Sequence, residues 1–434
     1  MTTDGYTLAP VETTLPNGLR VVVTPMPYAR STSISVYVGA GSRYEATEAD
    51  AGLSHFLEHL CFKGTRRRPR PLDISMEIDA IGGNINAATN RELTVYYAKV
   101  TPEFLERASD VIADMLREST LPPAEIERER GVIIEELAAV EDSPSEQAGL
   151  LLDGLLWPDQ PHGRDVGGTE ASVEAMPPQR IVEYYRRQYV ANATVVSIAG
   201  AVMPEAALDF VRRHYGDWPA GEPLPWVRDR PVPSGTRRGT RVGVLEKDSE
   251  QAHIAIGMRG VASADDDRYA LDLLSIVLGE GMSSRLFSRL REELGLCYDI
   301  HSYMSTLLDT GMFGIYAGVD PANATETVRE VARELARSLR SVTADELARA
   351  KAVSRSRTQL RLEDTRSVSA MYGSLAVLGL PLRTPEEALA RSQAVTLDDV
   401  RRVAERVIRE EALQLAIVGP VDGDPLDNAL SLGA

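Results

Sequence analysis

The feature that most constrains the fold is an internal repeat with a spacing of about 220 residues. Residues 33–39 alternate apolar and polar side chains as a strand does, and residues 253–259 do the same, which sets an offset of 220. A second pair of apolar strands ends at residues 197–200 and 416–419, with an offset of 219. Because two distant pairs give nearly the same offset, the sequence predicts a tandem duplication.

Length and proline distribution place the boundary between the copies near the middle. The chain has 434 residues, whereas single domains usually hold about 100–200. Five prolines between residues 218 and 234 are typical of an extended connection. We therefore predict an N-terminal domain at 1–217, a linker at 218–242 and a C-terminal domain at 243–434.

Each copy is expected to combine a sheet with packed helices. Strands at 18–24 and 33–39 have only a short connection, which favours antiparallel pairing. The predicted class is α+β, with two duplicated domains that each hold a mainly antiparallel sheet. The alternative is a parallel α/β sheet with a nucleotide site, but residues 279–281 lack a P-loop lysine and a third glycine. Apolar spacings of three and four predict helices at 102–116, 179–189, 322–339 and 397–408.

Charge and composition exclude several classes of partner. The net charge of −17 argues against nucleic acid and anionic membranes, because both attract positive surfaces. No apolar run is long enough to cross a bilayer, and the first residues lack a secretory pattern, so the expected location is the cytoplasm. The basic run at 66–70 is interpreted as a solvated loop. Since Cys61 and Cys297 are the only cysteines, a metal site must use histidines and carboxylates.

Residues 55–59, His-Phe-Leu-Glu-His, carry the expected chemistry. On a helix, His55 and His59 project from one face about a turn apart and can bind one ion. This is the inverted H-x-x-E-H motif of zinc peptidases. Zinc with three protein ligands keeps a position for water and lowers the pKa of that water to about 7, so Glu58 is the expected base. An ordinary helix is the alternative, but these side chains would be costly to bury without a partner.

The second copy has no such face. Adding 219 or 220 leads to Leu274, Val277 and Leu278, or to Ser275, Leu278 and Gly279. Neither set contains a histidine or a carboxylate. The contrast predicts that only the first domain binds metal and that the corresponding surface of the second copy packs in a core.

A third ligand is expected to be a carboxylate brought close by folding. Residues 124–137 are predicted to form a helix that begins after two prolines. This helix carries Glu129 and Glu136, which are seven residues apart and therefore nearly stacked on one face. One of the two can bind the metal, and the other can support it.

Five segments along the chain carry a resemblance to a known family: residues 15–20, 52–65, 86–89 with Glu92, 127–136 and 281–298. They resemble the pitrilysin and insulinase superfamily of zinc peptidases, most closely its two-domain members, which include the mitochondrial processing peptidase and related bacterial peptidases. The resemblance implies that Glu136 is the third ligand of one zinc ion per chain and that Glu129 is the supporting glutamate. Glu135 is the alternative ligand if the helix register differs by one residue.

The resemblance also implies contacts to substrate. Asn86 and Ala87 correspond to a strand that pairs with the backbone of an extended peptide, although Asn86 could instead cap a turn. Arg291 and Tyr298 correspond to an arginine and a tyrosine that hold the substrate carbonyl, and a tyrosine hydroxyl can donate to a developing oxyanion. Ordinary surface or packing positions are the alternative for this pair.

The predicted function is a zinc-dependent endopeptidase that encloses oligopeptides or unfolded segments in a chamber. Chambers of the family contain four related domains, and the duplication here provides two, so a homodimer or a heterodimer with a related chain is expected. In a homodimer, each zinc site would face Arg291 and Tyr298 of the partner chain. The alternatives are a catalytically silent structural subunit and a subunit that binds peptides without cleaving them.

Overall fold

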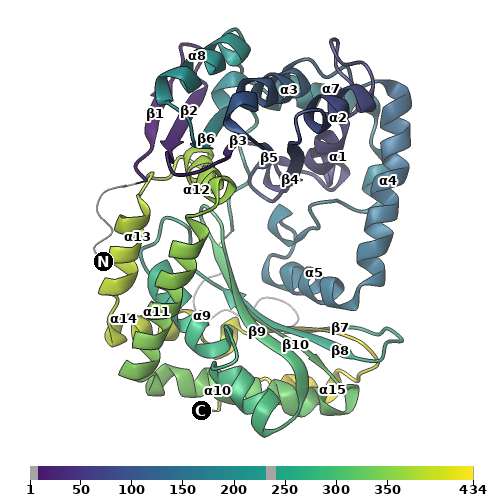
Figure 1. Cartoon of the computed structure of the whole chain (residues 1–434). Coiled ribbons are helices and arrows are strands. Elements are labelled where there is room, and N and C mark those ends of the chain that lie inside the picture. The colour runs from purple at the N-terminus through teal and green to yellow at the C-terminus, as the bar shows by residue number, and fades with distance from the viewer. Residues whose placement is uncertain (1–7, 231–240, 434) are drawn as a thin grey trace. The chain divides into compact units, whose positions relative to one another are not determined.

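The computed structural model describes residues 8–230 and 241–433, which form two compact units (Figure 1). The first unit comprises residues 1–137, 165–227 and 358–388, and the second comprises residues 138–164, 228–357 and 389–434. Each unit is built around one sheet. No helix in the described part of the chain is both long and apolar enough to span a bilayer.

The sheet of the first unit has six strands in the order β1-β2-β6-β3-β5-β4. Neighbours are antiparallel except for β2 and β6, which are parallel. The predicted pairing of the strands at 18–24 and 33–39 is wrong, because β6 lies between β2 and β3. Both faces of the central strand β3 are buried, and β4 forms one edge. The strands are β1 Val11–Thr14, β2 Arg20–Pro25, β3 Thr32–Val38, β4 Asn84–Thr89, β5 Thr94–Val100 and β6 Thr194–Gly200.

Helices cover both faces of this sheet. Alternate strand residues such as Val21 and Val36 pack in the main core with most of the helices, whereas Val22 and Tyr37 pack with α12 on the opposite face. The helices of this unit are α1 Leu53–Leu60, α2 Pro71–Asp79, α3 Leu105–Arg117, the larger part of α4 Pro123–Asp142, α6 Glu170–Ala175, α7 Pro178–Gln188, α8 Pro204–Tyr215 and α12 Thr365–Val377.

The sheet of the second unit has five strands in the order β7-β11-β8-β10-β9, and β7 and β11 are its parallel pair. One face packs against α5 and the other against the remaining core helices. The strands are β7 Val242–Leu245, β8 Ala252–Arg259, β9 Cys297–Thr306, β10 Gly311–Val319 and β11 Gln414–Val418. The helices are α5 Pro144–Leu156, α9 Arg268–Gly279, α10 Ala324–Ser341, most of α11 Ala344–Arg361, part of α13 Pro385–Ala394, α14 Leu397–Val407 and α15 Asp424–Ala429.

The two sheets share one topology, which confirms the predicted α+β class and duplication. Without β1, the order β2-β6-β3-β5-β4 matches β7-β11-β8-β10-β9 strand for strand. The registers agree as well, because Ile34 pairs with Ile198 in the first sheet, and Ile254 pairs with Ile417 in the second. These residues are separated by the offsets of 220 and 219 that the sequence predicted.

Each unit contains one helix from the other half of the sequence. Helix α12, from the second half, lies on the first sheet, where the Ser369 hydroxyl is 2.9 Å from Ser35 Oγ and donates to the Ser197 carbonyl. Helix α5, from the first half, lies on the second sheet, where Leu152 contributes to an apolar cluster. The boundaries 1–217, 218–242 and 243–434 stay a prediction, and residues 231–240 of the linker lie outside the described residues.

Candidate metal and substrate site

Helix α1 has an apolar face that fixes its place and a polar face that carries the histidines. Its buried side chains include Leu53, Phe56, Leu57 and Leu60. The helix begins after Gly52, whose φ of 88° lies in the left-handed region and where a Cβ would meet the Gly167 carbonyl oxygen at 2.3 Å.

The buried carboxylate of Glu45 supplies the missing cap at the start of α1. It accepts hydrogen bonds from the backbone N–H groups of Gly52 at 3.0 Å and Ser54 at 2.7 Å. Backbone donors in the first turn of a helix have no partner inside the helix, so an acceptor here stabilises this turn. The helix that carries the motif is thereby held at its N-terminal end.

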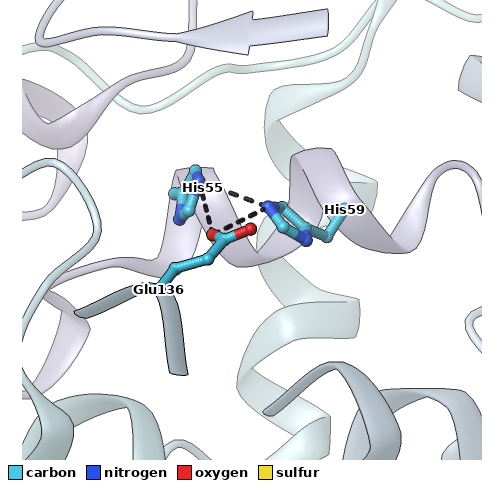
Figure 2. Close-up of side chains that lie close together, drawn as sticks. All are labelled: His55, His59 and Glu136. Atoms are coloured by element: carbon cyan, nitrogen blue, oxygen red, sulfur yellow. Dashed lines mark hydrogen bonds and ion pairs between the residues drawn. The ribbon is translucent and has the colours of Figure 1, made fainter. Parts of the chain in front are cut away.

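Three donor atoms converge beside α1. Figure 2 shows the imidazoles of His55 and His59 directed towards the carboxylate of Glu136, which comes from α4. The two Nε2 atoms are 3.3 Å apart, and Glu136 Oε2 lies 3.8 Å from His55 Nε2 and 3.5 Å from His59 Nε2. A zinc ion with tetrahedral bonds of about 2.0–2.1 Å requires ligand atoms roughly 3.3–3.4 Å apart. The spacing therefore fits three ligands of one zinc ion.

Glu129 lies on the other side of His59. Its Oε2 is 3.2 Å from His59 Nδ1, and its Oε1 is 2.7 Å from Lys63 Nζ. Glu129 is 3% exposed, so its charge is held by these two partners. A proton on Nδ1 that is donated to Glu129 leaves the Nε2 lone pair free to bind metal.

The environment of His55 also favours metal binding. Burial, together with the neighbouring His59, lowers the pKa of His55 to about 4, so the ring is neutral at pH 7. A metal ligand must be the neutral imidazole. Its Nδ1 atom is buried and has no hydrogen-bond partner within the described structure.

Glu58 lies next to the three donors and is held by a residue from another element. Thr89, the last residue of β4, donates its hydroxyl proton to Glu58 Oε2 over 2.5 Å. Burial raises the pKa of Glu58, and the hydrogen bonds from Thr89 and the charge of His59 oppose this effect. A half-buried carboxylate beside a metal site has the properties of a general base.

Asn86 and Ala87 lie on β4, the edge strand beside α1. Asn86 is inside the strand and not at a turn, and its side chain is exposed, whereas Ala87 faces the core. The Ala87 N–H donates to the Asn86 side-chain oxygen at 2.8 Å. This donor is therefore on the unpaired edge, where an added peptide strand would find it.

Arg291 and Tyr298 meet in the second unit. The Arg291 guanidinium lies 4.8 Å from the centre of the Tyr298 ring and 4.7 Å from that of Phe287. Tyr298 is 76% exposed and occupies a bulge, since the β9/β10 register passes from Asp299 opposite Gly318 to Cys297 opposite Val319. Bulges often redirect a side chain next to a functional site.

The corresponding helix of the second unit, α9, has no histidine or carboxylate at the positions aligned with His55, Glu58 and His59. Leu274, Ser275 and Leu278 are completely buried. Within the described residues, His55, His59 and Glu136 are the only group of three or more metal-binding side chains close enough to share an ion.

Comparison with known proteins identifies the family. Residues 20–170 match the family described as "Insulinase (Peptidase family M16)", and residues 175–354 match the one described as "Peptidase M16 inactive domain". An uncharacterized zinc protease of Streptomyces coelicolor is 39% identical over 94% of this chain and 89% of its own length. The chain belongs to the insulinase family, peptidase family M16. The predicted resemblance is thereby confirmed.

Two further similar proteins agree with this assignment. An uncharacterized zinc protease of Bacillus subtilis is 34% identical over 95% of this chain and 98% of its own length. The crystal structure of a protease from Helicobacter pylori superimposes with a TM-score of 0.89 over 96% of this chain and 100% of that one. At 24% identity, this likeness shows the fold alone.

The basic run at residues 66–70 is not part of the candidate site. Arg68 is 8% exposed and forms ion pairs with Asp110 and Asp114 at 2.7 and 2.8 Å. The interpretation as a solvated loop is therefore wrong for Arg68, because two carboxylates on α3 compensate its burial. Arg66 is exposed, as that interpretation requires.

Sequence reasoning missed three residues that support the M16 site. Thr89 and Lys63 lie within the segments that resemble the family, but nothing in their spacing indicates hydrogen bonds to Glu58 or Glu129. Glu45 lies outside those segments. A reader of the sequence could suspect Thr89 only after placing β4 beside α1.

Proposed function

We propose that this M16 chain is a zinc-dependent endopeptidase that hydrolyses oligopeptides or unfolded segments enclosed in a chamber. The observation that carries the proposal is the convergence of His55 Nε2, His59 Nε2 and Glu136 Oε2 beside the carboxylate of Glu58. The names of the relatives support zinc as the metal, and the donor set of two imidazoles and one carboxylate is typical of catalytic zinc.

The proposed metal ligands and the proposed base have separate roles in catalysis. Zinc held by three protein ligands supplies Lewis acidity, which makes water more acidic and polarises a carbonyl. His55, His59 and Glu136 would hold the ion, and Glu129 would fix the ring of His59. Glu58 would take a proton from the attacking water as its oxygen bonds to the carbonyl carbon. The same carboxyl would then deliver that proton to the amide nitrogen as the C–N bond breaks.

Substrate positioning would use two strands. An extended peptide would pair with the free edge of β4 at Asn86 and Ala87, so that main-chain hydrogen bonds hold it beside the base. Tyr298 and Arg291 would stabilise the carbonyl oxygen of the substrate. The exposure of the tyrosine ring supports this role, because a buried hydroxyl could not reach a substrate.

We propose further that each chain binds one zinc ion and that two chains form the working enzyme. A homodimer in which Arg291 and Tyr298 serve the zinc site of the partner is favoured over a heterodimer, because this chain carries both sets of residues. The four-domain chambers of the family support this arrangement.

The test is to identify the products formed from a mixed peptide library by mass spectrometry, on protein whose zinc content and subunit composition are known. Internal cleavage that stops on chelation and returns with zinc is the expected result. Capture of peptides without cleavage by zinc-loaded protein would instead support the peptide-binding alternative. Protein that takes up no zinc at neutral pH would contradict the proposal outright.

A further inference from the structure

The carboxylate of Glu58 is anchored outside its own helix. The Thr89 Oγ1 to Glu58 Oε2 distance is 2.5 Å, a short contact typical of a hydroxyl that donates to a carboxylate. An ionised carboxylate can only accept, so the single hydroxyl proton of Thr89 is committed to Glu58. Thr89 is part of β4 and Glu58 is part of α1, so this bond joins the strand to the helix.

A second hydroxyl fixes Thr89 from the interior of the sheet. Thr94 Oγ1 lies 3.1 Å from Thr89 Oγ1 and 3.1 Å from the carbonyl oxygen of Ala40. Since the proton of Thr89 is used on Glu58, Thr94 is the donor towards Thr89 or towards Ala40. Thr94 is completely buried. The β-branched side chain of Thr89 also has few rotamers, so its hydroxyl is held in one direction.

The same strand offers the edge for an added peptide. The Ala87 N–H is on the unpaired side of β4, where it donates to Asn86 Oδ1, and the backbone N–H of Thr89, two residues further along, donates to Glu58. A peptide strand that pairs there would fix the backbone of β4 up to the residue that holds the base. The hydroxyl of Thr89 is thus one hydrogen bond from the base and part of the strand that would carry the substrate.

We propose that Thr89 is a positioning residue that aligns the Glu58 carboxylate and couples its orientation to the occupancy of the β4 edge. The inference rests on the proposed function, because it takes Glu58 as the base. It adds the element that positions this base and explains why a threonine stands at the end of the strand. Thr89 touches neither the three donor atoms nor the predicted substrate contacts in the described structure, so its loss should leave zinc binding intact.

The kinetic test compares Thr89→Val, which keeps the shape and removes the hydroxyl, with Thr89→Ser, which keeps the hydroxyl. We expect Thr89→Val to lower kcat by about 10- to 100-fold, with unchanged KM and zinc content, and Thr89→Ser to restore most of the activity. Thr24→Val is the matched control, because Thr24 lies in β2 of the same sheet and its buried hydroxyl has no partner within the described structure. Equal kcat in Thr89→Val and Thr24→Val would overturn the inference.

A second measurement needs no activity. In chelator-treated protein, Thr89→Val should lower Tm by about 2 °C or more, since a buried carboxylate loses its hydroxyl donor. In a Glu58→Met background the same change should lower Tm by less, because only the contact with Thr94 is lost and there is no carboxylate to satisfy. Equal Tm shifts in both backgrounds would overturn the inference. Wild-type protein that binds zinc but cleaves no peptide would overturn the proposed function, and the Tm comparison would still decide whether Thr89 holds Glu58.

Discussion

Helices α1 and α9 occupy equivalent places in the two units but have opposite surfaces. An offset of 219 moves α1 onto residues 272–279, the last two turns of α9. Helix α9 buries every one of these residues except the first, whereas α1 keeps His55, Glu58 and His59 partly accessible beside Glu136. The candidate metal site therefore lies where the other copy has core packing. The comparison teaches that equivalent helices of a duplicated fold can serve different purposes, since one is buried in core packing and the other keeps polar side chains accessible.

The largest expected effect separates chemistry from metal binding on α1. Glu58→Gln keeps the size of the side chain and the zinc ligands but removes the proton acceptor. We expect kcat to fall by about 10²- to 10⁴-fold with zinc content unchanged, measured by peptide turnover and metal analysis. Near-normal turnover would remove Glu58 from the role of base and would leave α1 different from α9 only in metal binding.

The next largest effect distinguishes the roles of the acidic residues that face α1. Glu136→Gln should weaken zinc binding more than Glu129→Gln does, because Glu136 Oε2 lies beside the Nε2 atoms of His55 and His59. Glu129→Gln should cost about 10- to 100-fold in affinity or activity, since it acts through His59 Nδ1. Competition with a chelator of known affinity measures both. Glu135→Gln is the matched control, and a larger loss in that variant than in Glu136→Gln would contradict the ligand assignment.

A third experiment tests whether the two units supply different residues to one shared active site. Glu58→Gln and Tyr298→Phe are each expected to be nearly inactive. If the tyrosine of one chain serves the zinc site of its partner, a mixed dimer has one intact site. Free exchange of equal amounts should then restore about a quarter of the wild-type activity per chain. Verified exchange without recovery would reject the shared site, and an active monomer at high dilution would remove the need for a partner.

The smallest effect concerns stability in the absence of metal. Leu274→Ala on α9 should lower the free energy of unfolding by about 2–5 kcal/mol, because the side chain is completely buried. His55→Leu on α1 should raise it by roughly 1 kcal/mol in chelated protein, since His55 Nδ1 is buried without a partner within the described residues. Denaturant unfolding measures both changes. If both variants lose stability, the side chain of His55 does not destabilise the metal-free protein, and α1 and α9 do not differ in their contribution to stability.

Much of the fold could be predicted because the duplication repeats an apolar pattern. The offsets taken from residues 33–39 and 197–200 led to the central strands of both sheets. The exchange of α5 and α12 could not be predicted in this way. Amphipathic spacing shows that a helix has an apolar face, but it does not show which sheet that face will cover.

The site was predictable where local geometry determines it. Residues with the spacing of His55, Glu58 and His59 lie on one face of any α-helix. The motif alone was therefore enough to predict that these three side chains lie together. Glu129 and Glu136 share a face too, and spacing could not rank them. The structure distinguishes them, because one meets the Nε2 atoms and the other meets Nδ1 of His59. Thr89 required the pairing of β4 beside α1, which is a tertiary feature.

Because α5 and α12 each cover the sheet of the other half, the chain cannot be divided between its two halves without exposing apolar surface. A polypeptide that ended at residue 217 would carry α5 without the second sheet and would leave the first sheet without α12, so Val22 and Tyr37 would lose their cover. The same is true in reverse for a polypeptide that began at residue 243. Neither half would be a self-sufficient module, because each sheet takes one covering helix from the other half. Co-expressed halves could rebuild the protein as a split pair, whereas either half alone would expose apolar surface and aggregate.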